Sequence, residues 1–137
     1  MVKEIVKDEN ILTKKSIRAT KEDLYIIQDL IDTAEAHKDR CCGLAAIQLG
    51  YEKNICIILK DGKWIPFVNP MVSRRSINWF ENEESCMSLE GTRKAKRYEW
   101  IEVIYMDRNL KSKKMMLTGF PAVIIQHEMD HLKGVLI

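Results

Sequence analysis

The residues best suited to chemistry lie close together near the end of the chain, within residues 126–132. His127 and His131 are four positions apart, and Glu128 directly follows the first of them. In a helix this spacing places both imidazoles on one face, where they can bind one metal ion. Glu128 is then positioned to act as a general base toward a water molecule. The H-E-x-x-H pattern therefore predicts a hydrolytic metal site rather than a helix that carries two exposed histidines.

A catalytic metal site of this kind needs a third protein ligand. Only six residues follow His131, and none of them is acidic or a histidine, which excludes the common arrangements with a downstream third ligand. The ligand must therefore come from upstream. Cys86 is the strongest candidate, because a thiolate with two imidazoles is a known set for a tetrahedral metal with one open position. Glu84 is the competing candidate.

A further polar residue, Gln48, lies in the run of small and apolar residues at positions 41–50. Gly43 and Gly50 permit unusual backbone dihedrals and close approach to a neighbour or a ligand. If Gln48 is buried, its amide must form hydrogen bonds. Two interpretations stay open from the residues alone: a tight loop in which Gln48 caps a backbone group, which these residues favour, or a residue that contacts a ligand.

Hydrophobic periodicity indicates which elements must position these groups. Thr20 followed by Asp23 resembles a capping box, and apolar residues then repeat at helical spacing, which predicts a helix over residues 21–38. A last helix is expected to start near Pro121 and to end at Gly134. Strands are expected over residues 54–59 and 64–68, joined by a turn at 61–62, then from 71 after a break at 69–70, and over 100–106 and 113–117. We expect residues 1–19 to form an extended lead-in and the basic run 93–97 to be an exposed loop or edge.

One helix, several strands and a final helix are typical of an α+β fold. We expect a single domain over residues 1–137, with antiparallel or mixed β-sheets packed around the C-terminal helix that carries H-E-x-x-H. A chain of this length can bury roughly two-thirds of its unfolded surface in one core.

Composition restricts the possible partners. The chain has 22 Lys and Arg against 20 Asp and Glu, a net charge of +2, which argues against nucleic acid or a membrane as the main partner. Residues 1–20 carry charges throughout, so we expect no signal peptide and a cytoplasmic location. The four cysteines contain no C-x-x-C pair and are expected to be free thiols, one of them a candidate metal ligand. They are Cys41, Cys42, Cys56 and Cys86.

Three segments together resemble the three signature motifs of the peptide deformylases. The segments are Gly43-Leu44-Ala45-Ala46-Ile47-Gln48, Glu84-Ser85-Cys86-Met87-Ser88 and Gln126-His127-Glu128-Met129-Asp130-His131. Their order and spacing match the family, and the resemblance covers nearly the whole chain, from the first helix through Gly134.

The chain departs from the family pattern at three positions. Cys41 and Ser85 each replace a glycine that is usual in the family, and Ile47 replaces a common proline. The chain also ends without the C-terminal extension that many members carry. These departures could reshape the substrate cleft or stiffen the loop at Cys86, but none removes a group that does chemistry.

The resemblance implies one divalent metal ion bound by Cys86, His127 and His131, with water in the fourth position. The family typically uses Fe²⁺ in the cell, and such a ligand set also accepts Zn²⁺, Ni²⁺ or Co²⁺. Glu128 would transfer the proton. The Gln48 side-chain amide and the Met87 backbone N–H would stabilise the charge that develops on the carbonyl oxygen.

The implied reaction removes the N-formyl group from the N-terminal methionine of newly made polypeptides and releases formate. Cys42, Gly43 and Leu44 would bind the substrate, whose backbone would add as a strand. The expected partners are N-formylmethionyl nascent peptides at the ribosome, without direct recognition of nucleic acid and without a membrane.

Two other functions are compatible with the sequence. Cys41 and Ser85 allow a related enzyme that removes a different N-acyl group. The chain could also be a metal-binding module without catalysis, although a purely structural site would need neither Glu128 nor Gln48. Glu84 is expected to be a buried partner of Arg93 or Arg97 that braces the Cys86 loop.

Overall fold

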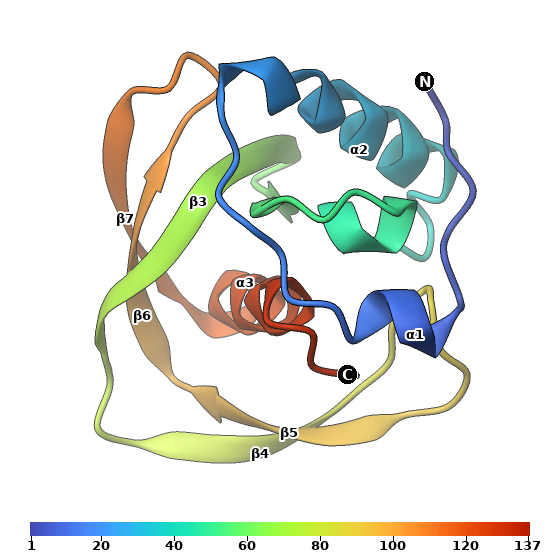
Figure 1. The fold of residues 1–137 in the computed structure, drawn as a ribbon. Helices are drawn as coiled ribbons and strands as arrows, with labels where there is room; N and C mark the ends of the chain where they lie inside the picture. The colour runs from blue at the N-terminus through green and yellow to red at the C-terminus, as the bar shows by residue number, and fades with distance from the viewer.

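The computed structural model describes all residues from 1 to 137, and its elements surround the last helix. This helix, α3 (Gly119–Leu132), is seen nearly end-on in Figure 1, between the segment that contains β1 and the pair β4–β5. Gly119 and Gly134, with φ of 62° and 80°, bound the helix, and Pro121 lies in its first turn as expected.

Five strands form one antiparallel sheet in the order β1-β2-β3-β6-β7, and two more form a separate antiparallel pair. The strands of the large sheet are β1 (Gly43–Ala45), β2 (Ile55–Lys60), β3 (Lys63–Arg75), β6 (Trp100–Met106) and β7 (Ser112–Thr118). The pair consists of β4 (Trp79–Glu84) and β5 (Arg93–Tyr98). The expected α+β class with antiparallel sheets around the C-terminal helix is confirmed.

The hairpin of β2 and β3 follows directly from the sequence. Asp61 and Gly62 both have positive φ, 52° and 75°, as a two-residue hairpin turn with the twist of its strands requires. In β2 the alternate residues Cys56 and Ile58 face α3, while Ile55 and Ile57 face the opposite core. A strand that is buried on both faces needs apolar residues at consecutive positions, and residues 55–59 show this pattern in the sequence.

The predicted break at residues 69–70 is wrong, because β3 continues through them. The pairing of β3 with β6 shifts register between Val68 and Met71, so that Asn69 and Pro70 lie in a bulge. Asn69 adopts φ of 51°, and its side-chain amide accepts from the N–H and donates to the C=O of Ala19 at 2.8 and 3.0 Å. A proline is tolerated at a bulge because its missing N–H is not needed there.

The helices differ from the expectation at their ends. The predicted helix over 21–38 consists of a 3₁₀ turn, η1 (Lys21–Asp23), and the α-helix α2 (Tyr25–Ala36). The capping interaction is present, since the Thr20 N–H donates to the Asp23 carboxylate at 2.8 Å. The lead-in also contains a short helix, α1 (Glu9–Leu12), which lacks the length to show a period. No helix has the length and apolar character needed to cross a membrane.

The basic run at residues 93–97 is strand β5, an edge strand of the two-stranded pair, so the expectation of an edge is met and that of an exposed loop is not. Its alternate residues point inward, and Arg97 is only 3% exposed. The Gln126 amide of α3 exchanges two hydrogen bonds with the Tyr98 backbone, at 2.8 and 3.0 Å. The pair β4–β5 is therefore fixed against α3.

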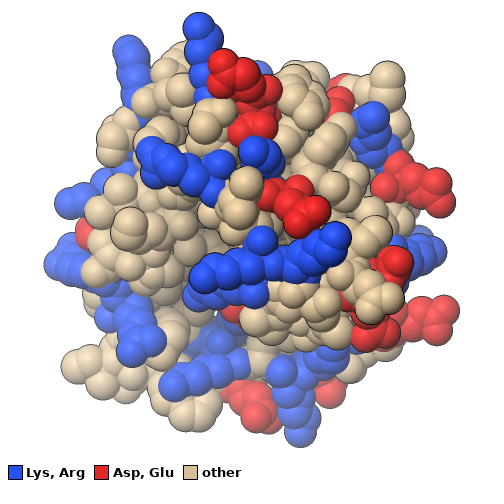
Figure 2. Space-filling view, viewed as in Figure 1, with Lys and Arg blue, Asp and Glu red and all other residues tan.

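Positive and negative side chains are interspersed over the molecular face seen in Figure 2.

Candidate active site

One face of α3 carries both histidines and forms the floor of a cleft of about 480 Å³. The residues on this face recur every three or four positions and are Phe120, Val123, Ile124, His127 and Glu128. One wall of the cleft comes from the chain that leads into β1, and the other comes from the end of β4 and the loop that holds Cys86. The site is therefore built where a sheet edge, a loop and a helix meet.

Cys86, His127 and His131 come together at the end of the cleft. Their ligand atoms all lie within 4.8 Å of one another. The Nε2 atoms of His127 and His131 are 3.1 Å apart, close to the separation of about 3.3 Å expected for two ligands of a tetrahedral ion with 2.0–2.1 Å bonds. Two ring nitrogens this close need either a shared proton or a cation between them. The three residues fit a metal ion with a soft sulfur and two nitrogen ligands.

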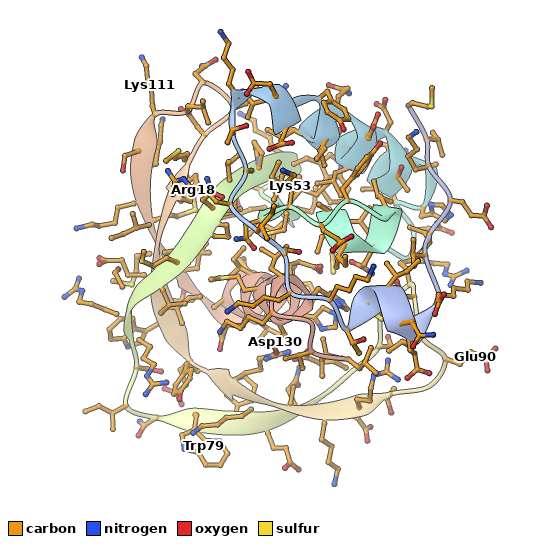
Figure 3. The ribbon with its side chains drawn as sticks, viewed as in Figure 1. Arg18, Lys53, Trp79, Glu90, Lys111 and Asp130 are labelled. Carbon is orange, nitrogen blue, oxygen red and sulfur yellow. The ribbon has the colours of Figure 1, made fainter.

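Glu84, the competing candidate for the third ligand, contacts His127 on the opposite side of its ring. The Nδ1–H of His127 donates to Glu84 Oε1 at 2.8 Å, which leaves the Nε2 lone pair free for a metal. Arg97 donates to both oxygens of Glu84 at 2.8 and 2.9 Å and to Asp130 at 2.7 Å. Asp130 lies on α3 on the side toward β4–β5 (Figure 3).

This network controls the charges around the ligands. Burial alone would raise the pKa of Glu84, but the hydrogen bonds from His127, Arg97 and Asn82 outweigh it and bring the pKa to about 2. Burial opposes ionisation of Cys86 in the same way, yet hydrogen bonds with His127 and the backbone at Ser88 lower its pKa. The ionised Glu84 carboxylate and a Cys86 thiol of lowered pKa thus flank the His127 ring, and they favour a positive charge at this position.

His131 is the neutral member of this candidate ligand set. Burial, together with the charge of His127, lowers the pKa of His131 to about 3. Its side chain is 1% exposed, and its Nδ1 atom is buried without a hydrogen-bond partner. A neutral imidazole is the form that binds a metal.

Glu128 has the burial and the acidity of a general base. Its carboxyl is 4% exposed, its Oε1 atom has no hydrogen-bond partner, and burial raises its pKa to about 7. The space beside it exists because residue 43 is glycine. A Cβ at Gly43 would lie 2.6 Å from Glu128 Oε2 and 2.6 Å from Ile124 Cγ2, which is closer than real contacts allow.

Gln48 forms the backbone cap that the sequence favoured, and it also lines the cleft. It lies in the 3₁₀ turn η2 (Ala46–Leu49), lines the cleft and is 1% exposed. Its Oε1 accepts from the Ala45 N–H at 3.0 Å, which is the expected backbone cap, and its Nε2 donates to Ser88 Oγ at 3.1 Å. An amide carries two N–H groups, so one N–H is left for a ligand.

The other expected site residues divide into two groups. Cys42, Gly43 and Met87 line the cleft, whereas the Leu44 side chain is fully buried in the core beneath α2 and can offer only its backbone. β1 pairs with β2 alone, so its other edge has no strand partner. Three apolar residues of the floor were not among the residues expected at the site: Phe120, Val123 and Ile124. Counting back from His127 by three, four and seven positions would have found them.

Known proteins are similar to this chain along its full length. The model of the polypeptide deformylase family matches residues 2–137. The chain is 49% identical to a peptide deformylase of Clostridium beijerinckii over 137 residues, with both chains covered completely. It is 36% identical to a peptide deformylase of Pelagibacter ubique over 84% of this chain and 69% of the relative. A class I type b peptide deformylase of Acinetobacter baumannii, solved with Met-Ala-Ser bound, superposes with a TM-score of 0.90 at 26% identity, over 99% of this chain and 97% of the other.

Proposed function

This chain belongs to the peptide deformylase family, and we propose that the cleft above α3 is its active site, with Cys86, His127 and His131 as the metal ligands. As a member of this family, the chain is a metal-dependent hydrolase that removes the N-formyl group from N-terminal methionine and releases formate. The observation that carries the site assignment is the convergence of one thiol and two Nε2 atoms beside an unpaired buried carboxylate.

For the metal we propose Fe²⁺ in the cell. The thiolate and imidazole donors suit several first-row ions, and the family resemblance favours iron among them. When bound, such an ion supplies Lewis acidity, which lowers the pKa of water and polarises a carbonyl oxygen. The role of the chain is to hold three ligands in place, and the Glu84 carboxylate fixes the orientation of the His127 ring.

Glu128 accepts the proton of the attacking water and later delivers it to the leaving amine. Its pKa of about 7 suits both steps near neutral pH, because the carboxylate is basic enough to take the proton and the acid is strong enough to return it. The Oε2 atom of this carboxylate lies against the space that Gly43 leaves free, and no side chain of the enzyme forms a hydrogen bond with Oε1.

Two donors stabilise the negative charge that forms on the formyl oxygen. These are the remaining N–H of the Gln48 amide and the backbone N–H of Met87. The cap to Ala45 and the hydrogen bond to Ser88 hold the Gln48 amide in one orientation before the substrate binds. Each such preorganised donor lowers the barrier by about 3 kcal/mol in comparable enzymes.

The substrate binds as an extended chain along the free edge of β1. The backbone groups of Cys42, Gly43 and Leu44 that face away from β2 are available to it, and strand addition uses such groups. The methionine side chain then lies on Val123 and Ile124. The Met-Ala-Ser peptide bound by the Acinetobacter baumannii enzyme supports a peptide ligand in this fold.

The departure from the family pattern at Cys41 is compatible with this function. The Cys41 side chain is 5% exposed and belongs to the core beneath α2, and its thiol donates to the Gly43 carbonyl at 3.2 Å. Ser85 is exposed at the rim of the cleft. Neither side chain occupies the space between Glu128 and the proposed ligands.

We further propose that residues 1–137 act as one domain in the cytoplasm, on N-formylmethionyl nascent peptides at the ribosome. The family match over residues 2–137 supports the single domain. The chemistry supports the location, because the formyl group to be removed is carried by newly made chains.

The decisive test is formate release from formyl-Met-Ala-Ser by protein loaded anaerobically with Fe²⁺. The Glu128→Ala variant, with equal metal content, should be slower by about 10²–10⁴-fold, the range for loss of a general base. An acetyl-Met-Ala-Ser control separates deformylation from removal of another acyl group. Faster turnover of the acetyl peptide would assign the enzyme a different substrate, and equal rates for wild type and variant would remove Glu128 from the mechanism.

A further inference from the structure

We infer that the lead-in (residues 1–19) positions the Gln48 amide relative to the metal site, and that the backbone N–H of Val6 is the group through which it acts. The inference rests on the proposed function, because it assumes that Gln48 stabilises the charge on the formyl oxygen. Val6 neither lines the cleft nor belongs to the candidate ligands, so it is a positioning residue rather than a catalytic one.

The lead-in is bonded to both elements that carry the site. In Figure 1 it runs beside η2 to α1 and then crosses in front of the near end of α3. On the first part of this path, the Val6 N–H donates to the Gln48 C=O at 2.7 Å. On the second part, the Ser16 N–H donates to the C=O of Leu132, the residue after His131, at 3.0 Å. One continuous segment therefore connects the turn of Gln48 with the end of the metal-binding helix.

The segment between these two bonds is anchored along its length. Its middle is the short helix α1, which is capped by the Asp8 carboxylate at 2.9 Å from the Asn10 nitrogen, and Leu12 is fully buried. Beyond α1 the chain packs closely against the end of α3, because a Cβ at Gly134 would collide with the Thr13 carbonyl. The lead-in therefore holds η2 at a fixed distance from the end of α3.

The turn η2 leaves the Gln48 carbonyl without a partner of its own. In a 3₁₀ turn the donor would be the N–H three residues later, that of Tyr51. The Tyr51 N–H instead donates to the Ala46 C=O at 3.1 Å. Gln48 is only 1% exposed, and a buried carbonyl needs a donor. The Val6 N–H supplies it.

The position of the Gln48 backbone determines where its free amide N–H points. Two hydrogen bonds, with the Ala45 N–H and the Ser88 hydroxyl, fix the orientation of the side chain. The bond from Val6 fixes the backbone from which this side chain extends. A misplacement of about 1 Å can cost 10²-fold in rate, because an oxyanion donor must lie at hydrogen-bond distance from the developing charge.

The test removes the Val6 N–H by the substitution Val6→Pro in the metal-loaded enzyme and measures formate release from formyl-Met-Ala-Ser. We expect kcat to fall by about tenfold, a part of the roughly 10²–10³-fold lost with a whole oxyanion donor. KM should change by less than about twofold, because the donor acts on the transition state. Metal content should equal that of the wild type.

Two control variants keep the hydrogen bond. Val6→Ala shortens the side chain but retains the N–H. Glu4→Pro places a proline at an exposed position of the same lead-in, where the N–H forms no hydrogen bond within the chain. Both should retain the wild-type kcat.

A second variant applies if Val6→Pro does not fold. Incorporation of α-hydroxyvaline at position 6 converts one backbone amide into an ester and removes the N–H without adding a ring. The Ile5 carbonyl of that amide accepts no backbone hydrogen bond, so the ester should disturb only the bond to Gln48. The same loss of about tenfold in kcat is expected.

A double-mutant cycle separates positioning from a general loss of stability. Gln48→Ala alone should lower kcat by about 10²–10³-fold. Adding the Val6 change should lower kcat no further, because Val6 acts through an amide that is already absent. The melting temperature should fall equally in both backgrounds, since both lose the same backbone hydrogen bond.

The outcomes separate the two proposals. Wild-type kcat in the folded Val6 variants, or an equal loss in the Gln48→Ala background, would overturn the positioning role and leave the deformylase activity intact. Wild-type kcat in Gln48→Ala would overturn it together with the role assigned to this amide. The absence of formate release from the wild-type enzyme would instead contradict the proposed function, and this inference with it.

Discussion

At the scale of single residues, the contact between Gly43 and Glu128 joins the proposed substrate-binding edge to the proposed general base. β1 approaches α3 so closely that only a hydrogen atom fits at position 43. The same close approach buries Glu128 and raises its pKa to about 7. One small residue thus allows the Glu128 carboxylate to be buried against β1.

Replacing Gly43 with alanine should impair the reaction more than the fold. The added methyl group would displace Glu128 and Ile124, at a cost in stability of about 1–3 kcal/mol that is typical of overpacking. We expect kcat to fall by about 10²-fold or more, because a misplaced base loses much of its effect. The measurements are kcat, metal content and thermal unfolding. Wild-type kcat in a metal-loaded variant would show that the carboxylate has room to move.

Replacing Glu84 with glutamine should weaken metal binding. The amide can still accept from His127, but it carries no charge to balance Arg97 or to hold the proton on Nδ1. Loss of a hydrogen-bond partner that orients a metal-binding histidine lowers the affinity for the metal by about 10–100-fold. Competition with a chelator measures this loss directly.

The matched control is Glu102→Gln. Glu102 is also buried and paired with an arginine, Arg74, but it lies on β6 away from the cleft. This variant should lower the melting temperature without changing metal affinity. Unchanged metal affinity and melting temperature in Glu84→Gln would refute the bracing role of Glu84.

At the scale of elements, the bulge in β3 holds the lead-in chain against the large sheet. The Asn69 side chain connects the sheet to the lead-in chain through two hydrogen bonds with the Ala19 backbone. The positive φ of Asn69 is better tolerated by asparagine than by most residues. The same region carries a parallel bridge between Ile17 and Lys53. The bulge therefore serves tertiary packing rather than ending the strand.

Asn69→Ala should lower the free energy of unfolding by about 2–3 kcal/mol, because it removes two hydrogen bonds and strains the backbone. Asn69→Gly loses the bonds but tolerates the φ value, so its loss should be smaller. Denaturant unfolding of both variants measures the difference. Equal stability of the alanine variant and wild type would mean that the bulge contributes nothing.

The pairing of β3 with β6 also predicts a pH dependence of stability. Hydrogen bonds from Arg74 and Ser73 lower the pKa of Glu102 to about 2, below the value of about 4.3 in an unfolded chain. The stabilisation is therefore complete above about pH 4.3 and is lost as the pH falls toward 2. The stability difference between wild type and Glu102→Gln should shrink over this interval. A difference that stays constant from pH 7 to pH 2 would exclude this carboxylate as the cause.

At the scale of the whole molecule, the proposed metal site joins parts of the chain that are distant in sequence. The Cys86 loop follows β4, and the two histidines lie on α3, whose other contacts reach β1, β2 and β7. A metal bound at this junction stabilises the folded state over the unfolded state. The ionised Glu84 carboxylate contacts the His127 ring, so a cation bound by this ring also lies near a negative charge.

Removal of the metal by a chelator should therefore lower the melting temperature of the wild-type protein. At a metal concentration of 100 times Kd, the linkage contributes about 2.7 kcal/mol. A Cys86→Ser variant, which lacks the thiolate ligand, should show a much smaller response to the same chelator. A melting temperature that does not respond to the chelator in either protein would argue against a metal bound by the folded state at this site.

What the sequence by itself determined is local in nature. The spacing of His127, Glu128 and His131 sets their placement on one helical face, because helical geometry depends only on neighbouring residues. The turn at Asp61-Gly62, the two-sided burial of β2 and the α+β class follow in the same way from short-range patterns. The free state of the four cysteines was also predicted correctly.

Only the tertiary structure decided how these local pieces meet. Glu84 and His127 are 43 residues apart, and whether Glu84 binds a metal or orients a histidine depends on how β4 packs against α3. The burial of Arg97 within a basic run and the dual hydrogen bonding of Gln48 depend on the same packing. Contacts of this kind arise from the arrangement of whole elements, which no short pattern of residues encodes.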